Sequence, residues 1–73
     1  MRHEETGLAN RLKELRAERG LTQEALAEAV EVTRKTINTV ERGRFVPSTV
    51  LALKLAAVLG VRVEEVFFLE KSA

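Results

Sequence analysis

Regularly spaced capping residues and glycines divide this chain into short helices. Helix-like segments are followed by glycines that can adopt the left-handed conformation closing a helix: Gly20, Gly43 and Gly60. Residues able to accept a hydrogen bond from a first helical turn precede such segments: Thr6, Thr22, Thr33 and Ser48. Pro47 marks a loop before Ser48. The regular spacing of these caps and glycines predicts several short helices.

The apolar residues between these marks recur every three or four positions, as on one face of a helix. Three segments show this spacing: Leu8, Leu12 and Leu15; Leu26, Ala27 and Val30; Ile37 and Val40. Segment 50–59 is apolar on nearly every side and is predicted to be the central helix, and a short fifth turn follows at 63–67. No stretch alternates with a period of two, so we expect no sheet. The predicted fold class is all-α, a compact five-helix domain.

The length of 73 residues predicts a single domain, residues 1–73, with a thin core. The chain has no Cys, so no disulfide supplements that core. The longest apolar run, 50–61, contains Lys54 and falls short of the roughly 20 residues that span a membrane. Residues 1–5 lack the apolar region of a secretory signal, so we expect a cytoplasmic protein.

Catalysis and metal binding find no support in the residue inventory. His3 is the single His, and Cys and Asp are absent, so no nucleophile, base and orienting group can be assembled. The adjacent pairs Glu4/Glu5 and Glu64/Glu65 would point about 100° apart on a helix, which favours solvated acids over an acid/base couple. We therefore expect no enzyme activity, no cofactor and no metal.

Segment 22–43 contains two predicted helices joined by only Glu31, Val32 and a cap. So short a link forces the second helix across the first at a steep angle, with Ala27 as the small residue at the contact. On a 3.6-residue wheel the outward face of the second helix carries cations and short hydrogen-bonding side chains but no acid: Lys35, Asn38, Thr39 and Arg42, with Arg34 at its edge.

The positive charge gathers in the same region. The whole chain has a net charge of +1, yet residues 33–47 carry four bases against Glu41 alone, a local net of +3. A local basic patch on a near-neutral chain suits an anion or nucleic acid, and it also suits an ordinary solvated loop. The segregation of cations from acids favours a polyanionic partner.

The chain resembles the phage repressor/Cro-type (XRE-like) helix-turn-helix regulators. The resemblance rests on the joint spacing of residues 10–16 (NRLKELR), 20–23 (GLTQ), 26–27 (LA), Ile37, 41–43 (ERG), Pro47, 59–61 (LGV) and 64–67 (EEVF). It implies a five-helix fold whose second and third helices, about 22–43, bind double-stranded DNA. It also implies a homodimer on a palindromic operator.

The resemblance assigns roles to individual residues. The implied base-contacting residues are Thr33, Arg34, Lys35, Asn38 and Thr39. The implied phosphate-contacting residues are Thr22, Gln23, Arg42, Arg44 and the backbone around Phe45. Alternatives stay open, because Thr33 can serve as a cap, Asn38 can hold a phosphate and Gln23 can be a surface helix former. Thr36 is expected on the packing side.

A structural ion pair between Arg16 and Glu41 is also implied, which keeps Glu41 off the DNA-contact list. Two positions depart from the family pattern. Glu31 stands where Gly is usual, at a cost of roughly 1 kcal/mol if its backbone is left-handed. Arg62 stands where a cap or Pro is common, so the last helix is expected to be short.

The apolar Phe68 and Leu69, within a tail at 63–71, are the predicted dimer contact, although they could instead fold back over the core. The hypothesis is a sequence-specific DNA-binding transcriptional regulator, most simply a repressor. Narrower versions are an antitoxin that also binds a toxin, or the controller protein of a restriction–modification system. The alternative of another class is a protein-interaction module that kept this fold and lost DNA binding.

Overall fold

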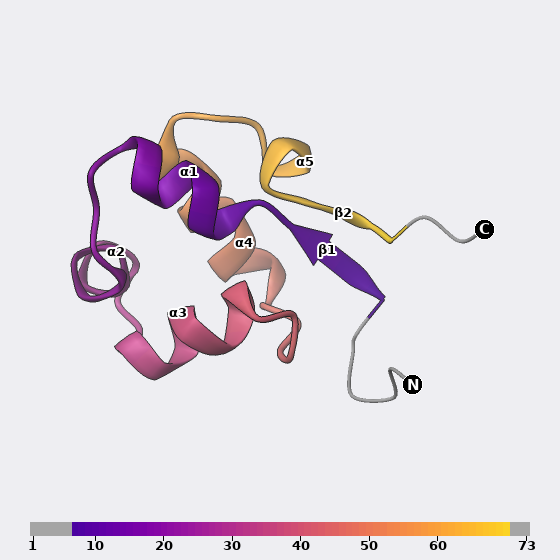
Figure 1. Ribbon diagram of the computed structural model, residues 1–73, viewed down its shortest axis with the longest axis horizontal. Helices are drawn as coiled ribbons and strands as arrows, with labels where there is room; N and C mark the ends of the chain where they lie inside the picture. The colour runs from indigo at the N-terminus through magenta and orange to yellow at the C-terminus, as the bar shows by residue number, and fades with distance from the viewer. Residues whose placement is uncertain (1–6, 71–73) are drawn as a thin grey trace.

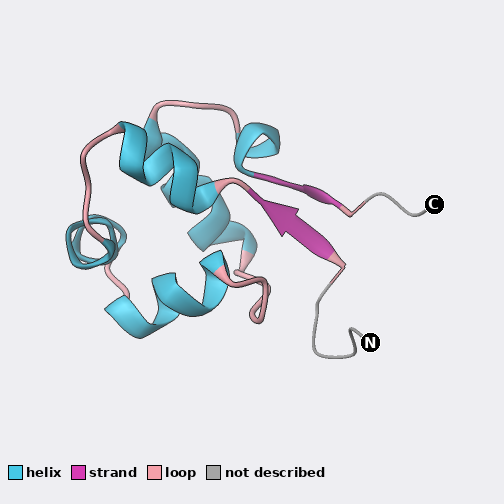
Figure 2. Cartoon of the chain, in the orientation of Figure 1, coloured by secondary structure: helices cyan, strands magenta, loops and turns pink. Residues whose placement is uncertain are grey.

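Five helices and two short strands make up the part of the chain that the computed structural model describes, residues 7–70 (Figures 1 and 2). Their bounds in chain order are β1 Leu8–Asn10, α1 Leu12–Glu18, α2 Gln23–Val30, α3 Arg34–Glu41, α4 Thr49–Leu59, α5 Val63–Val66 and β2 Phe67–Leu69. The predicted five-helix domain is confirmed. The prediction that the chain contains no sheet is wrong.

Three helices begin at the predicted caps. The hydroxyl of Thr22 accepts a hydrogen bond from the Ala25 N–H at 3.0 Å, and the Thr33 and Ser48 hydroxyls make the corresponding bonds at the starts of α3 and α4. The three glycines after α1, α3 and α4 all have left-handed backbones, with φ between 70° and 73°. The fourth predicted cap, Thr6, lies outside the described residues.

The unpredicted sheet joins the two ends of the described chain. Strands β1 and β2 pair antiparallel, with Leu8 opposite Leu69 and Asn10 opposite Phe67. Leu8 therefore belongs to a strand and not to the first helix, and Phe67 begins β2 instead of closing the fifth helical turn. Strands of three residues are too short to display an alternating pattern, and their partners lie far apart in the sequence.

Asn10 connects this sheet to two helices. Its side-chain oxygen accepts from the backbone N–H of Leu12 at 2.9 Å, at the start of α1. Its amide nitrogen donates to the backbone carbonyl of Val40 at 3.0 Å, near the end of α3. Because Arg11, the first flanking residue of α1, makes no side-chain cap, Asn10 supplies the missing acceptor and also ties α3 to the body of the domain.

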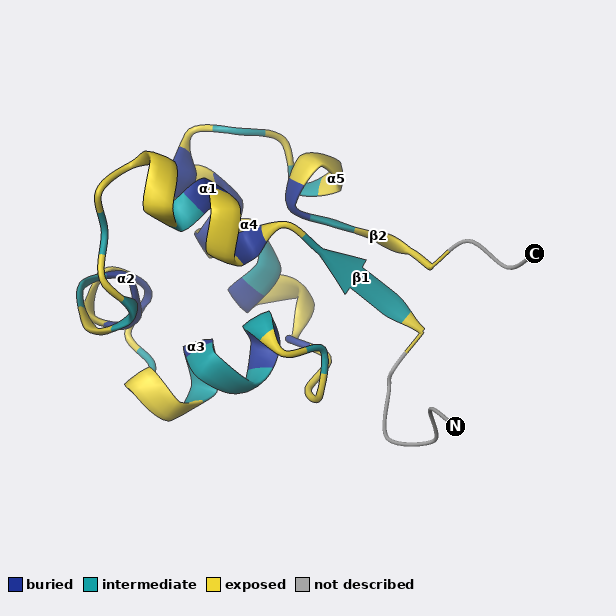
Figure 3. Cartoon of the chain, viewed as in Figure 1, coloured by how far each residue is buried: buried dark blue, intermediate teal, exposed yellow. Residues whose placement is uncertain are grey.

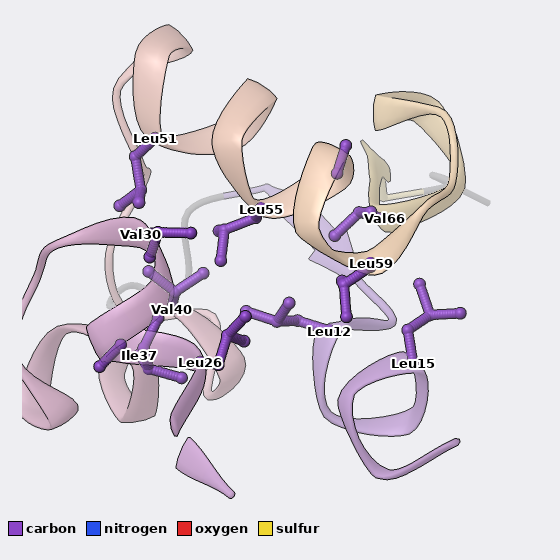
Figure 4. Packing of buried hydrophobic residues seen from close by; sticks show 12 residues of the cluster. Leu12, Leu15, Leu26, Val30, Ile37, Val40, Leu51, Leu55, Leu59 and Val66 are labelled. Atoms are coloured by element: carbon purple, nitrogen blue, oxygen red, sulfur yellow. The ribbon is translucent and has the colours of Figure 1, made fainter. Parts of the chain in front are cut away.

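The core is aliphatic and lies between the helices, with each helix contributing at least one buried side chain (Figure 4). The buried side chains of helix α4 lie on its core-facing side and are Leu51, Leu55, Ala56 and Leu59. Its other side is open, with Val50 63% and Leu53 54% exposed (Figure 3). The apolar sequence of α4 thus predicted a more fully covered helix than the structure contains. No helix in the described range combines the length and apolar character needed to cross a bilayer.

Helix α5 is short, as the unusual residue at position 62 predicts. The helix begins with two acids, and the carboxylate of Glu65 accepts from the backbone N–H of Arg62 at 3.4 Å. Backbone N–H donation at the helix start, followed by the Arg62 guanidinium 3.0 Å away, holds the pKa of Glu64 below its ordinary value. These acids therefore stabilise the first turn of α5 in place of a side-chain cap.

The turn between α2 and α3 uses a left-handed residue that is not glycine. Glu31 has φ 65° and ψ 43°, and it is the one such residue besides glycines among the described residues. The following Val32 donates its N–H to the Ala27 carbonyl at 2.9 Å, which completes the helix end. The Glu31 carboxylate also lies 3.2 Å from the ammonium of Lys54 on α4, in an exposed ion pair.

Replacing Glu31 by glycine is expected to raise the free energy of unfolding by about 1 kcal/mol, because glycine adopts this conformation without a clash at Cβ. The lost ion pair subtracts only a few tenths of a kcal/mol, since both side chains are exposed. Urea unfolding monitored by circular dichroism measures the change. Glu31→Ala is the matched control, because it loses the ion pair and keeps the strain. A Glu31→Gly midpoint at or below that of the parent would contradict the expectation.

Candidate nucleic-acid interface

The short link predicted between the second and third helices produces the expected crossing. In Figure 1, α2 is seen along its axis while α3 lies across the view beneath it, so the two helices cross steeply. Ala27 is 3% exposed where α2 faces the core, and Ile37 and Val40 anchor the inner side of α3 at 0% and 1%. This packing fixes which side of α3 faces solvent.

The outward side of α3 and the loop after it carry four exposed cationic side chains: Arg34, Lys35, Arg42 and Arg44. Within residues 7–70 none of the four forms an ion pair. Most other cations of the same range are each within 4.0 Å of a glutamate: Arg11, Arg16, Arg19, Lys54 and Arg62. Four of the five cations that form no ion pair within residues 7–70 therefore lie at one surface, which we call the α3 face, and the fifth is Lys13 on α1.

The threonines of α3 are hydrogen-bonded within the helix. Thr33 accepts the cap bond from the N–H of Thr36 at 3.2 Å, and the hydroxyls of these two residues lie 3.1 Å apart. The hydroxyl of Thr39 donates to the carbonyl of Lys35 at 2.7 Å. Thr33 thus acts as a cap, and its predicted base contact would be additional to that role.

Glu41 faces away from the α3 face and into a network with the rest of the domain. The guanidinium of Arg16 donates to both carboxylate oxygens, at 2.6 and 3.3 Å, and to the carbonyl of Leu21 at 2.8 Å. The carboxylate also accepts from the side-chain amide of Gln23 at 3.0 Å. The structure thus contains the ion pair that the resemblance implies, and adds Gln23 to it.

Gln23 and Thr22 stand at the start of α2, where the helix presents free N–H groups. Gln23 is partly buried, and its side chain bonds to Glu41. The alternative that Gln23 is only a surface helix former therefore does not hold. An amide nitrogen carries two hydrogens, so one remains available for an anion. Thr22 is exposed, and its hydroxyl oxygen accepts the cap bond.

The loop after α3 turns through Gly43, and the Arg44 N–H donates back to the Thr39 carbonyl at 3.1 Å. This turn places Phe45, 46% exposed, beside the outward side of α3. A pocket of about 150 Å³ opens between the two segments, lined by Lys35, Thr36, Thr39 and Phe45. The sequence did not predict this pocket, and Thr36, expected on the packing side, is partly exposed and lines it.

The spacing of residues 35, 36 and 39 puts them on neighbouring positions of a helix surface, so part of the pocket has a sequence signal. The contribution of Phe45 has none, because it depends on the path of the loop. Among the described residues, no cluster of His, Cys, Asp or Glu is suited to holding a metal ion.

Comparison with known proteins agrees with this geometry. Residues 12–66 match a family model described as helix-turn-helix. The chain is 47% identical over 64 residues to the HTH-type transcriptional regulator YgzD of Bacillus subtilis, covering 88% of this chain and 97% of that protein. It is 36% identical over 59 residues to the immunity repressor protein of Bacillus phage phi105, covering 81% of this chain and 41% of the repressor.

Among solved structures, the restriction–modification controller protein C.AhdI from Aeromonas hydrophila superposes with a TM-score of 0.71 at 44% identity. The match covers 75% of this chain and 83% of the controller protein. The fold, the uncompensated cations of the α3 face and these similarities lead to one assignment. The chain belongs to the helix-turn-helix family of DNA-binding transcriptional regulators of the phage repressor (XRE) type.

Proposed function

We propose that this protein is a sequence-specific regulator, acting as a repressor, that occupies a palindromic operator as a homodimer. The observation that carries the proposal is the α3 face, on which four cations lack an acidic partner in the described chain, while the one acid of α3, Glu41, is paired with Arg16. Unpaired Lys and Arg beside an outward helix suit the phosphates and base edges of the DNA major groove. Because its partner is DNA, the protein is proposed to act in the cytoplasm.

The base contacts are proposed to come from the first turns of α3. Arg34 or Lys35 can donate to the O6 and N7 acceptors of guanine. Asn38, whose side chain is partly exposed, can bond adenine or reach a phosphate instead. Thr33 and Thr39 can offer their methyl groups, since the hydroxyl of each already bonds within α3.

The phosphate contacts are proposed to flank these on both sides. The start of α2 offers Thr22 and the second amide hydrogen of Gln23. The end of α3 and its loop offer Arg42, Arg44 and the backbone at Phe45. Such contacts fix the position of α3 on the duplex without reading its sequence.

The dimer is proposed to form through β2. Phe68 is 41% and Leu69 82% exposed, while their neighbour Phe67 packs on the core. A single domain makes few phosphate contacts, so useful specificity needs two half-sites about 34 Å apart. The repressor role follows the name of the phi105 protein. The similarity to C.AhdI favours, as a second candidate, a controller protein of a restriction–modification system.

Selection of bound fragments from a random duplex library tests the proposal. The enriched duplexes are expected to contain two inverted copies of one short motif, with centres one helical turn apart. Analytical ultracentrifugation is expected to find two chains on each duplex. Failure to enrich any motif would contradict a sequence-specific regulator and favour the protein-interaction module.

The same complex tests the dimer contact. Leu69→Ser is expected to reduce binding to one chain per duplex at concentrations where the parent binds as two. Leu53→Ser on α4 is the matched control, since it also replaces an exposed leucine, 54% accessible. Loss of the two-chain complex in the Leu53→Ser variant alone would move the dimer contact from β2 to α4.

A further inference from the structure

The pocket between α3 and its following loop is an apolar hollow on an otherwise cationic surface. Its lining residues are Lys35, Thr36, Thr39 and Phe45, and its volume is about 150 Å³. Phe45 is 46% exposed, so much of its aromatic side chain is open to a ligand beside α3. The hollow opens beside the residues proposed to read bases.

The polar groups of the two lining threonines are already engaged. The Thr39 hydroxyl donates to the Lys35 carbonyl at 2.7 Å, and the Thr36 hydroxyl lies 3.1 Å from that of Thr33. Without breaking these bonds, the threonines offer a ligand chiefly their methyl groups. The phenyl ring of Phe45 and the aliphatic stem of Lys35 complete an apolar lining.

The major groove presents one kind of apolar group to such a hollow, the methyl group at C5 of a pyrimidine. That methyl occurs in thymine and, after modification, in 5-methylcytosine. The ammonium of Lys35 is a donor without an acceptor, so it suits the O4 acceptor of thymine and opposes the amino group that cytosine carries at the same place. The charge at the rim therefore selects thymine.

We propose that this pocket receives the 5-methyl group of one thymine in each half-site, and that Phe45 determines specificity there through its side chain. The inference rests on the proposed function, because it requires the α3 face to lie in the major groove. It goes beyond the predicted phosphate contact of the Phe45 backbone, which carries no information about base identity.

The test uses the full chain and the duplex enriched from the random library. Each thymine is replaced in turn by deoxyuridine, which lacks the methyl and keeps every hydrogen-bonding group. One position per half-site is expected to lose affinity by about three- to fivefold, because the stabilisation from burying one methyl group is lost. Fluorescence anisotropy titration measures each dissociation constant.

Three variants connect the effect to the pocket. Phe45→Ala and Thr39→Ser are expected to bind the thymine and deoxyuridine duplexes equally, since each removes part of the apolar lining and Thr39→Ser keeps the hydroxyl. Val46→Ala is the matched control, because Val46 is a neighbouring loop residue, 53% exposed, that does not line the pocket. It is expected to keep the full difference between thymine and deoxyuridine.

The possible outcomes distinguish a failure of the pocket proposal from a failure of the proposed regulator function. If the enriched duplex binds specifically but no thymine-to-deoxyuridine replacement weakens binding, the pocket proposal is overturned and the proposed regulator function is retained. Sensitivity that survives in both Phe45→Ala and Thr39→Ser also overturns it. A 5-methylcytosine at the sensitive position is expected to bind less tightly than thymine, and equal binding would overturn the role of Lys35. Absence of any enriched motif removes the proposed function and the inference together.

Discussion

Replacing Glu41 by alanine is expected to lower the free energy of unfolding by about 3–5 kcal/mol, the usual cost of removing one partner of a buried ion pair. The Glu41 side chain is 4% exposed and the Arg16 side chain 13%, so the guanidinium left behind has little access to water. Gln23 and Arg16 would both lose an acceptor. Urea unfolding measures the change, and each kcal/mol corresponds to a fall in Tm of about 4–8 °C in a domain of this size.

Two controls show whether burial causes the effect. Glu14→Ala removes the carboxylate of the exposed Arg11–Glu14 pair and is expected to change stability by less than about 1 kcal/mol. Arg16→Met combined with Glu41→Leu is expected to recover much of the loss, because no unpaired charge then stays buried. A Tm for Glu41→Ala equal to that of the parent would contradict the structural role of this pair.

Replacing Arg34 by alanine is expected to reduce discrimination between the enriched duplex and a scrambled one by about 1–3 kcal/mol. Arg34 is exposed at the start of α3 and has no acidic partner within the described residues, so its removal leaves the fold intact. The lost bidentate contact to guanine affects the enriched duplex and spares the scrambled one. The ratio of the two dissociation constants, measured by anisotropy titration, reports the change.

Arg44→Ala provides the matched comparison, because it also removes one exposed arginine from the same surface. A phosphate contact is independent of sequence, so this variant is expected to weaken both duplexes alike. The slope of log K against log salt concentration is expected to fall in magnitude by about 1. A change in discrimination with Arg44→Ala would mean that the loop reads bases.

The helices were predictable because their ends are determined locally. Thr22 and Ser48 cap through bonds to residues three positions along, and Gly60 closes α4 through its own backbone. The paired strands were not predictable, because Leu8 and Leu69 meet only after the helices between them have packed. The same holds for Asn10, whose amide bonds to Val40, thirty positions away.

The candidate site also contains some residues that could be placed from sequence and others that could not. The wheel positions of Lys35 and Thr39 follow from the period of the helix, so the outward face of α3 was accessible from sequence. The Arg16–Glu41 pair came from the resemblance, because charge and spacing do not show which glutamate an arginine meets. The pocket depends on where the loop carries Phe45, and the bond between Gln23 and Glu41 depends on how α2 meets α3. Neither has a local signal.

Whether the outward side of α3 reads base pairs is tested by comparing the Arg34→Ala and Arg44→Ala variants at one salt concentration. The measured quantity is the ratio of dissociation constants for the scrambled and the enriched duplex. If α3 reads bases, Arg34→Ala lowers this ratio at least fivefold, the lower end of its 1–3 kcal/mol range, while Arg44→Ala leaves it unchanged. An unchanged ratio with Arg34→Ala, or an equal fall in both variants, would contradict base reading by α3.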